Sequence, residues 1–288
     1  MIVKELTIVS GKGGSGKTTI AASFAALANN PVIADADVDA ADMHLLLQPT
    51  IQKREFFAGL DVAQKDDTKC NNCGKCYESC RYGAFDSDFV LNPDKCEGCA
   101  VCTIVCPVEA IKMVDRVSGE AYISSTRFGP LVHAKLRTGG EASGKLVALV
   151  RQRAKEMAEK TSRNLILIDG PPGIGCAVIA SITGADHVLV VVEPTLSGIH
   201  DAKRMIGLSK HFEIPVLACI NKFDINENNT ERIIRYCSSE GIKLVGKIPY
   251  DDITTKAMIA GKTVVEFSQG DFSQRLKDIW AKVEEVLS

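Results

Sequence analysis

The sequence lacks the excess of positive charge that most nucleic-acid-binding domains carry. Its 288 residues contain 34 Lys and Arg against 36 Asp and Glu, which gives a formal net charge of −2. A protein that binds nucleic acid usually presents a basic field to the phosphate backbone. We therefore expect no nucleic-acid partner.

Long apolar runs are also missing. No run approaches the roughly 20 residues that a membrane-spanning helix requires. The first apolar run ends at Gly11 and is too short and too strand-like for a signal peptide. Apolar residues in the last helical segment, 272–287, alternate with charges of both signs, so we expect this segment to pack onto a sheet and not onto a membrane. These features predict a cytoplasmic protein.

Cysteine, in contrast, is abundant. The chain has 11 cysteines, and eight of them lie between Cys70 and Cys106. Because no export signal is evident, this cluster is more typical of metal binding than of a disulfide framework.

Strand-like and helix-like segments alternate on both sides of the cysteine cluster. Near-continuous apolar runs, such as those at 164–170 and 187–195, are typical of a parallel sheet that is covered on both faces. The sequence therefore predicts a doubly wound α/β fold with a mostly parallel sheet, formed by residues 1–55 and 119–288. A small α+β domain at 56–118 is expected to interrupt it.

A phosphate-binding loop is predicted at the start of the chain. The stretch GKGGSGKTT follows the first strand, precedes an alanine-rich helix and satisfies the pattern G-x-x-x-x-G-K-[ST]. In such loops backbone N–H groups and the helix N-terminus face phosphate oxygens, a lysine reaches the β- and γ-phosphates, and a hydroxyl binds Mg²⁺. The expected ligands are ATP or ADP with Mg²⁺, and the predicted binding residues are Gly11, Gly13, Gly14, Ser15, Gly16, Lys17, Thr18 and Thr19.

The eight clustered cysteines form two groups with one spacing, C-x₂-C-x₂-C-x₃-C. This is the spacing of bacterial ferredoxins, in which the fourth cysteine of each group binds the other cluster. The sequence therefore predicts two [4Fe–4S] clusters. The first would be bound by Cys70, Cys73, Cys76 and Cys106, and the second by Cys80, Cys96, Cys99 and Cys102.

Two other interpretations of these cysteines stay open. Zinc also binds four thiolates, but usually through two separated C-x₂-C pairs. A disulfide framework is typical of exported proteins. Outside the cluster, Cys219 and Cys237 lie in apolar segments and are expected to be buried thiols.

The lysine pair in the phosphate loop resembles the deviant Walker A motif, K-G-G-x-G-K-[ST], of the MinD/Mrp/ParA superfamily, which includes the nitrogenase iron protein. This resemblance implies ATP hydrolysis, with Lys17 in the catalytic site. It also implies a nucleotide-dependent homodimer in which Lys12 reaches the partner's nucleotide. Cysteines near the dimer interface of the iron protein hold a bridging cluster, and Cys176 is a single candidate for that role here.

The resemblance extends to residues outside the loop. The stretch DADVDAAD resembles switch I, which implies that Asp37 polarises the attacking water and that Asp35 lies near Mg²⁺. The stretch ILIDGPPGIG resembles Walker B with switch II, so Asp169 is expected to hold Mg²⁺ through water. Asn221 resembles a residue that contacts adenine, and Pro249 resembles one that lies against the base.

The whole chain resembles MinD-superfamily ATPases that carry an inserted ferredoxin domain. The function this implies is an ATPase whose nucleotide state gates electron transfer through the two clusters to a protein partner. One alternative is an iron–sulfur assembly carrier of the Mrp type, and another is a positioning or regulatory ATPase that senses redox state. Four cysteine ligands per cluster argue against easy cluster release, which favours the electron carrier.

Overall fold

The computed structural model describes residues 3–137 and 143–288. The chain divides into two compact units. The first, called here the α/β unit, comprises Met1–Arg54, Ala121–Lys135 and Ser143–Ser288, and the second, the cysteine unit, comprises Glu55–Glu120 and Leu136–Ala142. The insert was expected at residues 56–118, so its observed start at Glu55 is one residue earlier and its observed end at Glu120 is two residues later. The short segment after residue 135 was not expected in the insert.

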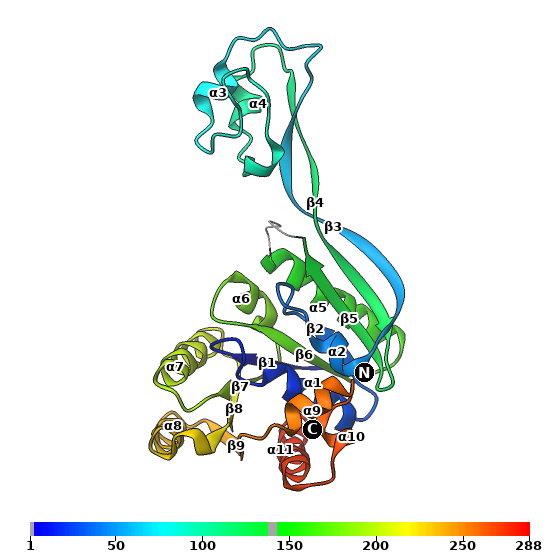
Figure 1. The fold of residues 1–288 in the computed structure, drawn as a ribbon, viewed down its shortest axis with the longest axis vertical. Helices are drawn as coiled ribbons and strands as arrows, with labels where there is room; N and C mark the ends of the chain where they lie inside the picture. Colours follow the sequence, from blue (N-terminus) through cyan, green and yellow to red (C-terminus); the bar gives the residue numbers. More distant parts are fainter. Residues whose placement is uncertain (1–2, 138–142) are drawn as a thin grey trace. The chain divides into compact units, whose positions relative to one another are not determined.

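The helices and strands of the α/β unit alternate along the chain (Figure 1). They are β1 (Lys4–Ser10), α1 (Lys17–Leu27), β2 (Val32–Asp35), α2 (Met43–Leu47), β5 (Pro130–Leu136), α5 (Ser143–Lys160), β6 (Leu165–Pro172), α6 (Cys176–Ile182), β7 (His187–Val192), α7 (Leu196–His211), β8 (Val216–Asn221), the 3₁₀ helix η2 (Phe223–Ile225), α8 (Glu227–Ser239), β9 (Lys243–Ile248), α9 (Ile253–Ile259), α10 (Val264–Phe267) and α11 (Asp271–Leu287).

Two long strands, β3 (Thr50–Lys65) and β4 (Ile111–Ser125), carry the chain into the cysteine unit and back. That unit also holds α3 (Lys75–Ser79), the 3₁₀ helix η1 (Pro93–Lys95) and α4 (Val101–Val105). The sequence did not indicate β3, because most of its residues are exposed and charged residues interrupt any apolar alternation.

Nine strands form one sheet in the order β3-β4-β5-β2-β6-β1-β7-β8-β9. β1 lies between β6 and β7 and is parallel to both, and the pairs β2–β5, β2–β6, β7–β8 and β8–β9 are parallel as well. The expected mostly parallel sheet is confirmed. The carboxyl ends of these strands share one edge, where Asp35 pairs with Asp169, and open α/β sheets bind their ligands at such an edge.

Helices cover both faces of the sheet. On one face α1, α10 and α11 pack in a core that includes Leu6, Phe24 and Trp280. On the other face α6, α7 and α8 pack around Val190 and Ile206. Successive residues of a strand point to opposite faces, so a strand that is covered on both sides is apolar throughout.

The C-terminal helix α11 belongs to the first of these cores. Its apolar positions are buried, as expected: Leu276, Ile279, Trp280, Val283 and Leu287. Burial of each large apolar side chain stabilises the fold by about 1.5–3 kcal/mol. Within the described parts of the chain, no helix is both long enough and apolar enough to cross a membrane.

The cysteine unit contains an internal repeat at an interval of 26 residues, the interval between Cys70 and Cys96. α4 follows α3 at this interval. The backbone conformation repeats at the same interval. Residues with left-handed φ occur as the pairs Asn72 and Gly98, Gly74 and Ala100, and Gly83 and Glu109. The sequence repeat is therefore a structural repeat.

Candidate nucleotide site and four-cysteine cavities

The phosphate loop joins β1 to α1 at the carboxyl edge of the sheet. Gly14 and Gly16 have φ values of 77° and 87°, which glycine adopts without strain. A Cβ on Gly16 would lie 2.2 Å from Nδ2 of Asn221, whose side-chain amide donates a hydrogen bond of 2.7 Å to the carbonyl oxygen of Ser15. The loop conformation thus depends on a glycine and on an amide from the end of β8.

Lys17 is the charged centre of the site. Its Nζ lies 2.8 Å from Oδ1 of Asp169 and 3.5 Å from Oδ2 of Asp37, and all three side chains are nearly excluded from solvent. Burial by itself lowers the pKa of Lys17, but attraction by Asp169, and then by Asp37 and Asp35, outweighs it, so this pKa is raised. Lys17 is therefore charged at neutral pH.

Asp35 holds the loop that follows β2. Its Oδ1 accepts a hydrogen bond from the Asp37 N–H, and its Oδ2 accepts one from the Met43 N–H, both at 3.2 Å. Burial, followed by repulsion from Asp169, raises the pKa of Asp35 well above its usual range. Burial also raises the pKa of Asp37, against the attraction of Lys17.

Lys17 and Asp37 border a cavity of about 560 Å³. Most of the residues predicted from the sequence line it: Lys12, Gly13, Gly14, Ser15, Gly16, Lys17, Thr18, Thr19, Asp37, Asn221 and Pro249. Gly11, Asp35 and Asp169 are not part of the wall. Gly11 packs against Asp201, where a Cβ would lie 2.1 Å from the Asp201 Cβ, and the two carboxylates lie behind Lys17 and Asp37.

Several residues of the wall were not predicted, among them Lys222 and Tyr250. Lys222, next to Asn221, donates a hydrogen bond of 3.0 Å to the carbonyl oxygen of Gly14 and lies 3.5 Å from Glu193. Tyr250, next to Pro249, is 63% exposed and borders the cavity. A lysine and a tyrosine at strand ends carry no motif of their own, so only their neighbours could have suggested them.

Lys12 also lies on the cavity wall. Its Nζ is 3.5 Å from Oγ1 of Thr195, at the start of α7, and its carbonyl oxygen accepts a hydrogen bond of 2.9 Å from the Ser10 hydroxyl. In this single chain its ammonium therefore contacts a neutral hydroxyl group.

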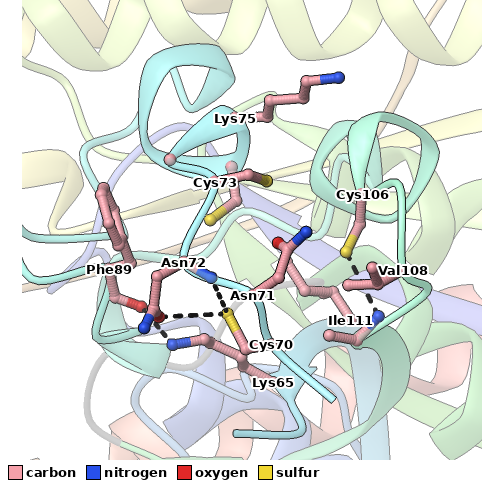
Figure 2. A pocket seen from close by; sticks show the side chains of 13 residues that line it. Lys65, Cys70, Asn71, Asn72, Cys73, Lys75, Phe89, Cys106, Val108 and Ile111 are labelled. Carbon is pink, nitrogen blue, oxygen red and sulfur yellow. Dashed lines mark hydrogen bonds between the residues drawn. The ribbon is translucent and has the colours of Figure 1, made fainter.

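Two cavities of the cysteine unit are each lined by four cysteines. Cys70, Cys73, Cys76 and Cys106 border the first, which Figure 2 shows from close by with Lys65, Asn71 and Phe89. Cys80, Cys96, Cys99 and Cys102 border the second. These are the two sets that the crossed ferredoxin pattern predicts, with one cysteine exchanged between the sequence groups.

The thiols of each set are close enough to influence one another. The pKa of Cys102 is raised to about 11, mainly by burial and then by Cys96, Cys99 and Cys80. In the first cavity burial raises the pKa of Cys76, with Cys70 adding to the rise. Grouped thiolates repel one another and need a cation or metal centre nearby, so both donor sets fit an iron–sulfur cluster chemically.

Backbone N–H groups already donate to several of the sulfurs. Ala84 N–H donates to Cys80 at 3.4 Å and Ala110 N–H donates to Cys106 at 3.2 Å, one repeat apart. Ala63 N–H donates to Cys96 at 3.4 Å. Hydrogen bonds of this kind stabilise thiolate ligands and raise the potential of a cluster.

No group of three or more His, Cys, Asp or Glu side chains in the described residues is arranged to hold a single metal ion. The two four-cysteine sets are therefore identified by the cavities that they line.

The remaining cysteines are separate from both cavities. Cys219 and Cys237 are buried, as expected, and burial raises the pKa of Cys219 to about 12. Cys176 is exposed at the start of α6, with its sulfur 3.7 Å from the Ser143 hydroxyl.

A glycine-rich loop between a strand and a helix, with a buried lysine at the carboxyl edge of a parallel sheet, defines a P-loop nucleotide-binding protein. The profile of the CobQ/CobB/MinD/ParA nucleotide binding domain matches residues 6–264. The chain belongs to this family.

Known proteins resemble the chain over nearly its full length. An uncharacterized protein of Methanocaldococcus jannaschii is 33% identical over 99% of this chain and 98% of its own. The iron-sulfur cluster carrier protein of Pyrococcus abyssi is 23% identical over 97% of this chain and 85% of its own. The septum site-determining protein MinD of Pyrococcus horikoshii, solved with Mg-ADP, has a TM-score of 0.64 at 15% identity and covers 99% of this chain and 97% of its own, a likeness that shows the fold alone.

Proposed function

We propose that this protein is an ATPase in which the nucleotide state controls electron transfer through two [4Fe–4S] clusters to a protein partner. The observation that carries the proposal is that one chain combines a cavity around Lys17 with two cavities that are each lined by four cysteines. Membership of a nucleotide-binding family supports the first half, and the crossed cysteine sets support the second.

ATP binding requires Lys17 to change partners. Its ammonium now pairs with Asp169 and Asp37, and a triphosphate in the cavity would compete for it with a higher negative charge. With Lys17 on the phosphates, Thr18 and Asp169 would be the residues that hold Mg²⁺, Asp169 through water, and the ion would neutralise charge on the phosphates. Asp37, on the cavity wall, is then placed to orient the attacking water.

We assign Asp35 to the same magnesium site, although its side chain does not line the cavity. It carries no contact to the cavity, and its two oxygens hold the backbone of Asp37 and Met43. We propose that Asp35 positions the loop that presents Asp37 and would lie near a bound Mg²⁺ or its waters.

The two cysteine sets would hold one cluster each. A bound [4Fe–4S] cluster supplies reversible one-electron storage at a potential that its surroundings tune. The N–H groups of Ala84, Ala110 and Ala63 already point at sulfurs, so the chain's own backbone would stabilise the thiolates.

Chain connection supports a link between nucleotide and clusters. The loop that carries Asp37 leads into α2 and then into β3, which enters the cysteine unit. The carbonyl oxygens of Leu46 and Leu47 accept hydrogen bonds of 2.8 and 2.9 Å from Arg127, so the end of α2 is tied to the chain that returns from β4. Loops that contact a γ-phosphate rearrange when it is cleaved, and α2, which follows the Asp37 loop, is succeeded in the chain by β3.

Lys12 supports a nucleotide-dependent homodimer. Its ammonium contacts only the Thr195 hydroxyl on the described chain, at 3.5 Å, so its charge is available to an anionic group of a partner. We propose that Lys12 binds the phosphates held by a second copy. Lys12→Ala is expected to keep nucleotide binding in the monomer but to remove the dimer that ATP induces, as measured by light scattering.

The function is tested on protein purified without oxygen. We expect about eight irons per chain, hydrolysis of ATP, and a rate of reoxidation by an oxidised viologen dye that differs between ATP, ADP and no nucleotide. Equal rates in all three states would contradict the control of electron transfer, and iron-free protein would contradict the clusters.

A second function, iron–sulfur cluster delivery, is favoured by one observation, the similarity to the cluster carrier of Pyrococcus abyssi. The same preparation decides between the two. A carrier transfers iron and sulfide to an apo-ferredoxin within minutes, whereas an electron carrier keeps its iron through repeated reduction and oxidation.

A further inference from the structure

The two four-cysteine cavities differ in the charge beside them. We infer that the cluster bound by the first set, Cys70, Cys73, Cys76 and Cys106, has the higher reduction potential and accepts the first electron, because Lys65 lies at its edge. This inference rests on the two clusters of the proposed function, and it assigns a role to a lysine outside any motif.

Lys65 ends β3 and lines the first cavity. Its Nζ donates to the carbonyl oxygen of Phe89 at 3.0 Å and lies 2.9 Å from Asp67, and Figure 2 shows its ammonium beside Cys70. The Lys65 side chain is 8% exposed, whereas that of Asp67 is 83% exposed. Water therefore screens the carboxylate more than the ammonium, and a net positive field remains at the cavity.

The structural repeat identifies the matching position at the second cavity. The Asp66 N–H donates to the Ala110 carbonyl oxygen, and one repeat later the Asn92 N–H donates to the Ala84 carbonyl oxygen, both at 2.7 Å. Lys65 precedes the first of these donors and Leu91 precedes the second. The repeat position that holds an ammonium on the wall of the first cavity therefore holds the apolar side chain of Leu91 in the other half of the repeat, and Leu91 packs in the small core of the unit.

Other charges on the two walls act in the same direction. Lys75 lines the first cavity, although its ammonium points away from the cysteines in Figure 2, and its repeat partner in the second cavity is Val101. Among the described residues that line the second cavity there is no Lys or Arg, and the one charged side chain there is Glu97.

Reduction adds one electron to a cluster and forms no bond, so the cluster becomes more negative by one charge. A cation at the wall stabilises this state more than the oxidised one, and an anion does the opposite. A low-potential one-electron donor is therefore expected to reduce the first cluster before the second. Lys65 at the first cavity and Glu97 at the second thus give the first cluster the higher reduction potential.

The test is an anaerobic redox titration of the full chain with reduced viologen dyes, followed by electron paramagnetic resonance. We expect two one-electron steps with at least about a tenfold preference for the first, which is about 59 mV. The upper step is the one at the higher potential, assigned to the first cluster. Lys65→Met is expected to lower the potential of this step by an amount equal to about a tenfold change in the equilibrium constant for reduction, and to leave the potential of the lower step unchanged. Asp67→Asn is expected to move the same step up, because it removes the counter-charge.

Lys282→Met, a change at an exposed position on α11, is the matched control and is expected to move neither step. The inference is overturned if Lys65→Met leaves the upper step unchanged or moves the lower one. If the Lys65→Met variant loses iron, the test uses the Asp67→Asn variant, whose substitution is at an exposed position. An unchanged potential of the upper step in that variant overturns the inference. Iron content separates this result from the proposed function: about eight irons with equal or inverted steps reject only the role of Lys65.

Discussion

Nζ of Lys17 lies 2.8 Å from Oδ1 of Asp169, and this pair joins the phosphate loop to the end of β6. Both side chains are almost fully buried, and the second carboxylate oxygen of Asp169 has no hydrogen-bond partner among the described residues. Lys17 therefore has to leave the predicted magnesium-binding carboxylate before its ammonium can bind a phosphate.

Removal of Lys17 is expected to leave the carboxylates of Asp169 and Asp37 buried without a counter-ion. We expect Lys17→Met to lower the free energy of unfolding by about 3–5 kcal/mol and to abolish ATP hydrolysis. The double variant Lys17→Met/Asp169→Asn is expected to recover part of the stability but none of the activity. Urea unfolding of the single and double variants measures the coupling, and additive effects would contradict the pairing.

The glycines of the loop are expected to differ in tolerance. Gly16→Ala brings a Cβ within 2.2 Å of the Asn221 amide at a φ of 87°, so nucleotide affinity is expected to fall by at least about tenfold, with a loss of stability of roughly 1–3 kcal/mol. Gly13 has no atom within 4 Å of an added Cβ, and Gly13→Ala is the matched control. Equal affinities for a fluorescent ATP analogue in the two variants would argue against the geometry described.

Asp37 and Asp39 provide a second matched pair, because one lies buried beside Lys17 and the other is exposed two residues later. Asp37→Asn is expected to slow ATP hydrolysis by about 100-fold or more with little change in nucleotide affinity, since it removes the group that orients water. Asp39→Asn is expected to hydrolyse ATP at the normal rate. Phosphate release under saturating ATP measures both.

The crossed cysteine sets predict which pairs of substitutions damage the same cluster. Cys106→Ser and Cys73→Ser are each expected to disturb the first cluster, so their combination costs about four irons per chain. Cys106→Ser combined with Cys99→Ser is expected to damage both clusters and to lower iron content further. If Cys106→Ser instead affected the same cluster as Cys99→Ser, each sequence group would hold its own cluster and the crossing would be wrong.

His133 is expected to make the fold sensitive to acid. Its ring stacks on Tyr122 and its Nε2 lies 2.9 Å from the Ser124 hydroxyl, and burial, followed by His44, lowers its pKa to about 4. Between this value and the ordinary pKa near 6.5 the unfolded chain binds a proton that the folded chain does not. The free energy of unfolding is therefore not reduced by His133 above about pH 6.5, and it decreases as the pH falls from there toward 4.

The size of this effect is about 3 kcal/mol at most. Denaturant titrations between pH 7 and 4 are expected to show it in the wild type and not in His133→Gln, which keeps a polar group near Ser124. An identical pH dependence in the two proteins would show that His133 does not titrate in this range.

Several features followed from the sequence because they depend on local patterns. The Walker motif fixes Lys17 at the start of a helix, and apolar strands such as 187–195 require cover on both faces and thus a parallel sheet. The spacing of the cysteines predicted the sets that line the two cavities, since short loops bring neighbouring thiols together.

Only the tertiary structure decided which groups from distant segments meet. The pairing of Lys17 with Asp169, the hydrogen bond from Asn221 to the phosphate loop, and the hydrogen bond from Lys65 to Phe89 join residues that no local spacing connects. The backbone contacts that match Lys65 to Leu91 depend on strand ends that the sequence did not indicate. Local propensity sets where helices and strands begin, whereas long-range packing decides which charges remain close together and out of water.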